Sequence, residues 1–176
     1  MLSITKQVQE RLKRKKLTGY KLSKLIDYKD SSLYKMIGGK IAFPDHVIEK
    51  IAPILGVSVE EIKIWILADK YPKEVFEQAI RLKKEKQDDK LLLTTKLDEI
   101  LHSKQLSRTA LSKLIKYSQG GLNEMIIGKE PMSKQVISKI SVALDIPENE
   151  IKCWIATDKY SIESLEKALK ILQNKG

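Results

Sequence analysis

The sequence of 176 residues contains a single cysteine, Cys153, and only two histidines, His46 and His102. One cysteine can form neither an internal disulfide nor a cysteine-based zinc site, and no carboxylate or thiol stands at metal-ligand spacing from either histidine. We therefore expect no metal site. The longest apolar runs are far shorter than a membrane span, and no charged leader precedes an apolar segment. These absences predict a cytoplasmic protein without a membrane segment.

Patterns of catalytic residues are absent as well. The sequence has no nucleophile–base arrangement, no glycine-rich phosphate loop and no paired acidic motif. We therefore expect neither an enzyme nor a bound cofactor. What the sequence has in excess is positive charge, since 33 lysines and arginines stand against 23 acidic residues and give a net charge of +10. A basic balance of this size favours an anionic partner, either nucleic acid or an acidic membrane surface.

The chain contains an internal repeat. Shifted by 89 residues, it aligns with itself without a gap, and residues 17–71 show 25 identities over 55 positions. Leu22-Ser-Lys-Leu-Ile26 matches Leu111-Ser-Lys-Leu-Ile115, and Asp69-Lys-Tyr71 matches Asp158-Lys-Tyr160. Weaker similarity extends to both flanks. The duplication predicts two domains of similar architecture, residues 1–87 and 90–176.

Both repeats have the pattern of helices throughout. Apolar residues recur at spacings of three and four, and no segment of useful length alternates with period two. We therefore predict an all-α protein with about six short helices in each domain. Ser58-Val-Glu-Glu61 is a capping box, and Thr95-Lys-Leu-Asp98 is a looser one that predicts another helix start. Pro53 falls inside the fourth helix and predicts a kink or an early stop there.

The segment 17–40 has the spacing of a helix-turn-helix. One helix carries Leu22, Leu25 and Ile26 inward, and a turn follows at residues 27–29. A second helix begins near Asp30 with Leu33, Met36 and Ile37 inward. The frame recurs at residues 106–129. The chain resembles the helix-turn-helix family of the lambda repressor and Cro over roughly residues 6–68 and 95–157, on Leu17-Thr18, Leu22-Ser23, Ser31-Ser-Leu33 and Gly39-Lys40. The resemblance implies two lambda-repressor-like domains that place recognition helices in the major groove of double-stranded DNA.

A recognition helix can be apolar along one stripe only, so its other side is free to contact bases. The predicted base-reading residues are Asp30, Ser31, Ser32, Tyr34 and Lys35 in the first repeat and Gln119, Gly120, Gly121, Asn123 and Glu124 in the second. The predicted phosphate contacts come from the flanking cations Lys21, Lys24, Lys40, Arg108, Lys113 and Lys129. The family often has glutamine at the start of the first of the two helices, where this chain has Gly19 and Arg108.

Other conspicuous residues are predicted to be structural. Trp65 and Trp154 occupy matched positions on apolar helical faces, which indicates core packing. Cys153 replaces Ile64 in the repeat, which indicates a small buried side chain rather than a redox switch. The sixth helices carry apolar faces that either pack within the domains or form a homodimer, made of Val75, Phe76, Ala79, Ile80, Leu165, Ala168, Leu169 and Leu172.

The sequence therefore predicts sequence-specific binding of double-stranded DNA. We expect a transcriptional repressor of phage, plasmid or chromosomal type, acting as a covalent pseudo-dimer or as a homodimer. Two alternatives stay open. Acidic residues on both recognition helices favour a protein-interaction module, such as an inhibitor or antirepressor, and DNA binding without regulation would suit plasmid partition or replication control. The operator and any small-molecule inducer are not specified by the sequence.

Overall fold

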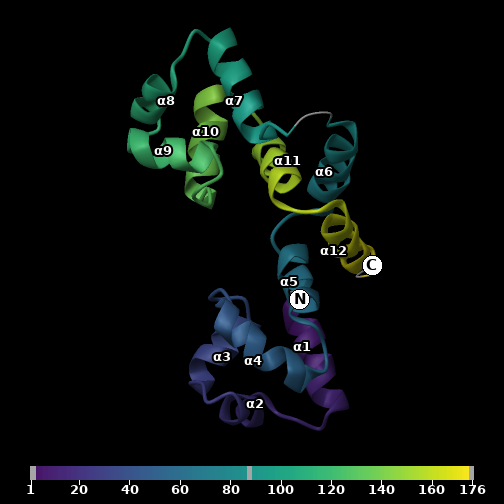
Figure 1. Ribbon diagram of the computed structural model, residues 1–176. Helices are drawn as coiled ribbons and strands as arrows, with labels where there is room; N and C mark the ends of the chain where they lie inside the picture. The colour runs from purple at the N-terminus through teal and green to yellow at the C-terminus, as the bar shows by residue number, and fades with distance from the viewer. Residues whose placement is uncertain (1–2, 87–88, 175–176) are drawn as a thin grey trace. The chain divides into compact units, whose positions relative to one another are not determined.

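The computed structural model describes residues 3–86 and 89–174, and this part of the chain forms twelve α-helices and no strand (Figure 1). The first repeat contains α1 (Ser3–Arg14), α2 (Gly19–Leu25), α3 (Asp30–Ile37), α4 (Asp45–Leu55), α5 (Val59–Ala68) and α6 (Lys73–Glu85). The second contains α7 (Leu92–Ser103), α8 (Arg108–Leu114), α9 (Gln119–Ile126), α10 (Lys134–Leu144), α11 (Glu148–Lys159) and α12 (Ile162–Gln173). The predicted all-α fold is confirmed. None of these helices is long and apolar enough to cross a membrane.

The helices pack into two compact units whose limits differ from those of the repeats. Within the described residues, unit 1 extends to Pro72 and resumes at Lys167, and unit 2 is Lys73–Glu166. Helix α6 of the first repeat therefore belongs to unit 2, where it packs against α11. The end of α12 belongs to unit 1, where Ile171 packs against the core. The boundary expected between residues 87 and 90 is the limit of the sequence repeat, and independent folding of the two repeats stays a prediction.

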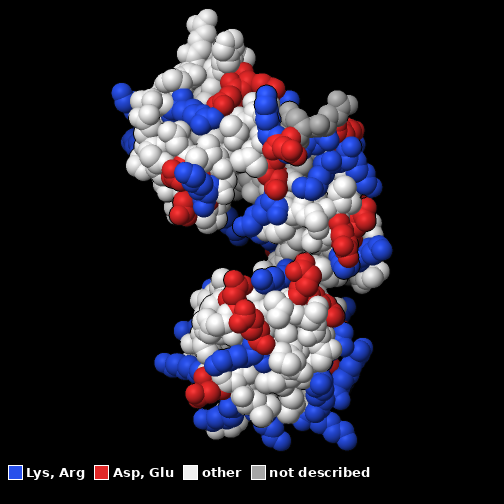
Figure 2. Space-filling view, in the orientation of Figure 1, with Lys and Arg blue, Asp and Glu red and all other residues white. Residues whose placement is uncertain are grey.

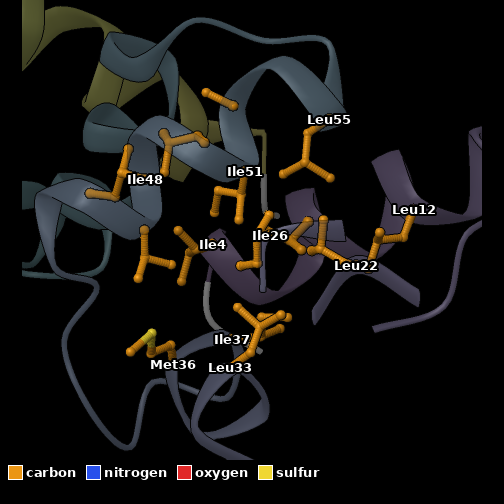
Figure 3. Packing of buried hydrophobic residues seen from close by; sticks show 14 of the residues in the cluster. Ile4, Leu12, Leu22, Ile26, Leu33, Met36, Ile37, Ile48, Ile51 and Leu55 are labelled. Carbon is orange, nitrogen blue, oxygen red and sulfur yellow. The ribbon is translucent and has the colours of Figure 1, made fainter. Parts of the chain in front are cut away.

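Each unit has its own hydrophobic core, formed by equivalent residues of the two repeats. In unit 1 the inward side chains of α1 to α5 converge on fully buried Leu22 and Ile51 (Figure 3). In unit 2, Leu111 and Ile140 occupy the same places. Burial of each such side chain contributes about 1.5–3 kcal/mol. The two tryptophans are 3% exposed and belong to these cores, as predicted, and Cys153 is fully buried.

An aspartate caps the first helix of each repeat. In the first repeat this aspartate follows the end of α5, and in the second it lies near the end of α11. Asp69 accepts hydrogen bonds from the first two backbone N–H groups of α1, at 2.6 and 2.9 Å. Asp158 does the same for α7, at 2.8 and 2.9 Å. A negative charge there satisfies unpaired donors and interacts favourably with the helix dipole. The repeated Asp-Lys-Tyr motif therefore ties the two ends of each helix-turn-helix domain together.

Two expectations about helix ends are wrong. Helix α7 begins at Leu92, so Thr95 lies inside it, and its hydroxyl donates to the carbonyl of Leu91 rather than capping a helix start. Asp158 supplies the cap from elsewhere in the chain. Helix α4 does not stop early, since it continues two residues past Pro53 and matches α10 in length. The proline costs the helix one hydrogen bond, because it has no N–H to donate to the carbonyl of Glu49, and only two residues follow it in the last turn. A kink at Pro53 stays a prediction. Ser58, by contrast, caps α5 as predicted, accepting from the N–H of Glu61 at 3.0 Å.

Candidate nucleic-acid interface

The two helices of the predicted motif are α2 and α3 in unit 1. Thr18 caps α2 by accepting from the N–H of Lys21 at 3.1 Å. The turn between the helices is tight because Asp27 adopts a left-handed backbone, with φ of 49°, and the N–H of Tyr28 donates to the carbonyl of Ser23 at 2.9 Å. In unit 2, α8 and α9 are joined by the same turn, with equivalent residues in the same conformation. The predicted helix-turn-helix is confirmed in both repeats. The predicted inward position of Leu25 and of its equivalent Leu114 is wrong, because each is the last residue of its helix and is 60% or 58% exposed.

Each second helix is held to the scaffold along one stripe and at its end. In α3 the stripe consists of Leu33, Met36 and Ile37, all of which are buried. In α9, Leu122 and Ile126 are fully buried. The hydroxyl of Thr5 on α1 donates to the carbonyl of Ile37, the last residue of α3. The hydroxyl of Thr94 on α7 donates to the last carbonyl of α9 at 2.7 Å. This pair is not part of the helix-turn-helix spacing and was not predicted, although the two threonines align in the repeat.

The outer side of α3 is accessible in unit 1. Asp30, Ser31, Tyr34 and Lys35 are exposed, and Ser32 is half-buried. One carboxylate oxygen of Asp30 accepts from the neighbouring N–H of Ser31 at 2.6 Å, which reduces the capacity of Asp30 for other contacts. The ring of Tyr34, 53% exposed, faces the start of α2.

A glycine at the start of α2 makes room for that ring. A Cβ atom added to Gly19 would lie 2.9 Å from the ring of Tyr34. The second repeat has Arg108 and Asn123 at these two positions, so the family departure at Gly19 coincides with a different residue on the recognition helix. We infer that Gly19 positions Tyr34 on the outer surface of α3.

The outer side of α9 is less open. Gln119 and Gly120 are exposed, but Asn123 and Glu124 are half-buried. The amide oxygen of Asn123 is enclosed and has no hydrogen-bond partner within the described chain. The Glu124 carboxylate lies 3.8 Å from the ammonium group of Lys129. Despite two glycines in its first turn, α9 starts at Gln119, because the hydroxyl of Ser118 caps it. Gly121, also half-buried, donates its N–H to that hydroxyl at 3.3 Å.

The predicted phosphate contacts differ between the repeats in their existing partners. Lys21, Lys24 and Lys40 are exposed, and none forms an ion pair in the described part of unit 1. In unit 2 the guanidinium of Arg108 donates two hydrogen bonds to Asp98, at 2.8 and 2.6 Å, and these raise the pKa of Arg108. Lys129 is paired with Glu124, which leaves Lys113 as the one predicted cation of unit 2 with no ion pair among the described residues.

The net charge follows the same trend. Residues 7–68 contain 12 basic and 7 acidic side chains, a net charge of +5, whereas residues 96–157 contain 9 and 7, a net charge of +2. Figure 2 shows basic side chains around α2 and the end of α1 in unit 1, and acidic and basic side chains side by side near α9 in unit 2. Unit 1 is therefore the more favourable electrostatic surface for a DNA backbone.

Two residues outside the predicted set bear on this surface. Tyr20 in the first turn of α2 is 53% exposed, and the ammonium group of Lys24 lies 5.4 Å from the centre of its ring. Asp98 is the partner of Arg108 and comes from α7, ten residues earlier in the chain. The predicted set takes only cations from α2 and no residue from α7, so it contains neither Tyr20 nor Asp98. The described residues contain no cluster of three or more potential metal ligands.

Comparison with known proteins identifies the domain. The Cro/C1-type HTH DNA-binding domain matches residues 7–68 and, a second time, residues 96–157. No curated protein and no solved structure matches the chain. The first match includes α2 to α5 and most of α1, and the second includes α8 to α10 and most of α7 and α11, so both include the recognition helix. The chain therefore belongs to the Cro/C1-type helix-turn-helix DNA-binding family, carries its domain twice, and is a sequence-specific DNA-binding protein.

Proposed function

We propose that the protein is a transcriptional repressor that occupies operator DNA with both units of one chain, as a covalent pseudo-dimer. The observation that carries the proposal is the pair of recognition helices, α3 and α9, which share one buried frame and differ in their outer residues. Proteins of this kind bind two half-sites about one helical turn, or 34 Å, apart. A duplicated chain can meet both half-sites alone, and its operator then differs in sequence between the halves.

The two units contribute unequally to binding. Each phosphate that a lysine neutralises releases counterions, which adds about 0.9 to the slope of log affinity against log salt concentration. Lys40 has no acidic partner among the described residues, whereas its equivalent, Lys129, is paired with Glu124. We expect unit 1 to supply most of the affinity and the outer residues of α9 to supply specificity at the second half-site.

Selection of bound sequences from random duplex DNA, repeated at several salt concentrations, tests the proposal. We expect an asymmetric site with two different half-sites. Lys40→Ala is expected to make the salt slope shallower by about one unit, and the matched variant Lys129→Ala by less. A perfectly palindromic site would contradict the pseudo-dimer, because symmetric DNA requires two copies of one reader.

The regulatory role needs its own measurement. Placing the selected site over a promoter in front of a reporter gene should lower transcription when the protein is present. An unchanged reporter, with intact DNA binding, would favour a role in plasmid partition or replication control. A homodimer through the sixth helices is the expected arrangement if the site is palindromic, although Val75, Phe76 and Ala79 are already fully buried within this chain.

A second candidate function rests on the paired charges of unit 2. Arg108 and Lys129 both have carboxylate partners, so α8 and α9 offer fewer unpaired cations than α2 and α3 do. Such a surface suits a protein partner better than a DNA backbone, and unit 2 would then act as an interaction module. Failure of the full chain to select any duplex at low salt would favour this function for the whole protein.

A further inference from the structure

We propose that unit 2 carries a docking groove for an acidic amphipathic helix of another protein. The groove has a volume of about 440 Å³ and lies between the end of α8 and the outer side of α10. It is formed by Leu114, Ile115, Lys116, Lys139, Val142 and Ala143. None of these residues is a predicted contact with bases or phosphates, so a partner bound here leaves the predicted DNA surface uncovered. The inference does not depend on the repressor role.

Two exposed apolar side chains give the groove its character. Val142 is 81% exposed, more than any other large apolar side chain of the described chain, and Leu114 is 58% exposed. Valine is a poor helix former, and an exposed one contributes little to the core of its own domain. Single exposed apolar residues are common, but these two line one groove together with Ile115. The fold of unit 2 does not require apolar side chains at these two positions, whereas binding of an apolar partner surface would require them.

The rim of the groove is positively charged. Lys116 and Lys139 are exposed, and neither has an ion-pair partner among the residues that the structure describes. Glu148, which hydrogen-bonds a serine of the groove wall, is already paired with Lys152 at 2.8 Å. Two lysines beside an apolar centre complement a partner that has apolar residues flanked by aspartate or glutamate.

The equivalent place in unit 1 keeps an exposed leucine, Leu25, at the position of Leu114, but differs in its charge and in its second apolar residue. The turn there carries Asp27 instead of a lysine, and Pro53 replaces the exposed valine. Lys50, the equivalent of Lys139, folds back and donates to the carbonyl of Ile26 at 3.1 Å. The groove is therefore specific to unit 2, whose recognition surface also has fewer unpaired cations. Divergence of the two copies at this place indicates a separate role for unit 2.

Other occupants fit the groove less well. A small ligand is usually enclosed in a deep pocket, whereas this groove is an open surface whose polar groups, two lysines and a serine, lie beside an apolar floor. A DNA backbone would place phosphates against Leu114 and Val142. A second copy of this chain carries a net charge of +10 and would bring its own lysines to the rim. A helix with apolar residues at i and i+3 or i+4 fills the floor and pairs its acidic residues with the lysines.

Selection from a displayed library of short helical peptides, with the full-length protein as target, tests this inference. We expect enriched peptides with two or three apolar residues at helical spacing and a net negative charge. Their affinity should be on the order of micromolar, because the contact is small, and should fall with salt. Val142→Asp is expected to weaken binding by about tenfold or more, because it removes apolar contact and repels the acidic peptide. Lys116→Ala combined with Lys139→Ala should weaken it by about fivefold.

Matched controls separate the groove from the rest of the protein. Pro53→Asp places the same charge at the equivalent position of unit 1 and should leave peptide binding unchanged. The Val142→Asp variant should keep its helical circular dichroism spectrum and bind selected duplex DNA within about twofold of the parent. Enriched peptides without acidic residues, or peptides indifferent to Val142→Asp, would overturn the inference. So would a library that yields no binder, or a loss of DNA binding in the same variant.

Discussion

At the scale of single residues, two glycines of the helix-turn-helix segments differ in whether a neighbouring side chain depends on them. Gly120 lies exposed in the first turn of α9, and a Cβ atom there would meet nothing within 4 Å. Gly19 opens α2, and a Cβ atom there would meet the ring of Tyr34 at 2.9 Å. The glycine of α9 therefore has no packing role in the folded unit, whereas the glycine of α2 determines where a predicted base-reading ring lies.

Replacing each glycine by alanine tests this difference. Gly120→Ala should raise the free energy of unfolding by about 0.5–1 kcal/mol, because alanine is the better helix former, and should increase the melting temperature by a few degrees. Gly19→Ala should change stability by about 1 kcal/mol or less, since the exposed ring of Tyr34 can move aside, but should alter base preference in the half-site read by unit 1. Thermal unfolding and duplex selection measure the two effects. An unchanged preference after Gly19→Ala would show that Tyr34 does not read bases.

At the scale of elements, the contact between α6 and α11 closes unit 2. The thiol of Cys153 lies 3.2 Å from the side-chain oxygen of Gln78 and 3.8 Å from the carbonyl of Val75. Thr157 is fully buried, and its carbonyl accepts from the ammonium group of Lys83 at 2.6 Å. Burial raises the pKa of Cys153 to about 11. Below the ordinary pKa of a thiol, the protonated form is therefore favoured in both the folded and the unfolded chain.

This raised pKa predicts that the reactivity of the Cys153 thiol reports on the separation of α6 from α11. At neutral pH the folded thiol should react with a disulfide reagent far more slowly than the thiol of the denatured chain, because its thiolate fraction is much smaller and its sulfur is enclosed. Phe76→Ala, which shortens a fully buried side chain of α6, should speed labelling.

The same group gives a pH dependence with a definite sign. Its folded pKa lies above the usual value near 8.5, so the stability that protonated Cys153 contributes is present below about pH 8.5 and is lost as pH rises toward 11. Cys153→Ala should therefore lose less stability over that range than the parent does.

In the labelling experiment, equal rates for the folded and the denatured protein would contradict the buried contact of Cys153.

At the scale of the whole molecule, the repeat and the contacts divide the chain at different places. The repeat predicts that residues 1–87 and 90–176 fold separately. The contacts place α6, residues 73–85, in unit 2 against α11. A fragment of residues 90–176 therefore lacks the helix that covers Thr157 and Cys153, both of which are fully buried in the intact chain.

Two fragments with the same C-terminus distinguish these boundaries. Residues 73–176 should unfold cooperatively on heating, whereas residues 90–176 should melt at a clearly lower temperature or associate through the uncovered face of α11. Circular dichroism and sedimentation provide the measurements. Equal melting temperatures of the two fragments, both monomeric, would instead establish the repeat boundary as the domain boundary.

The sequence by itself determined the repeat, the helices and the helix-turn-helix frame. These features depend on local relations, namely apolar spacing of three and four, turn residues and the gap-free alignment, and a local relation can be recognised without knowing the fold. It also determined the core, because Trp65 and Leu22 fall on the buried faces of periodic helices. The fourth helix was harder, since the effect of Pro53 depends on its distance from the helix end.

Only the tertiary structure decided which distant groups meet. The spacing of Asp98 and Arg108 does not show that they pair, and the capping of α7 by Asp158 joins residues 66 positions apart. The position of α6 is the clearest case. The amphipathic pattern of α5 and α11 cannot tell which of them α6 will cover, because both helices offer a largely apolar face at equivalent positions. That choice depends on the course of the chain between helices, and therefore on three-dimensional geometry rather than on residue type.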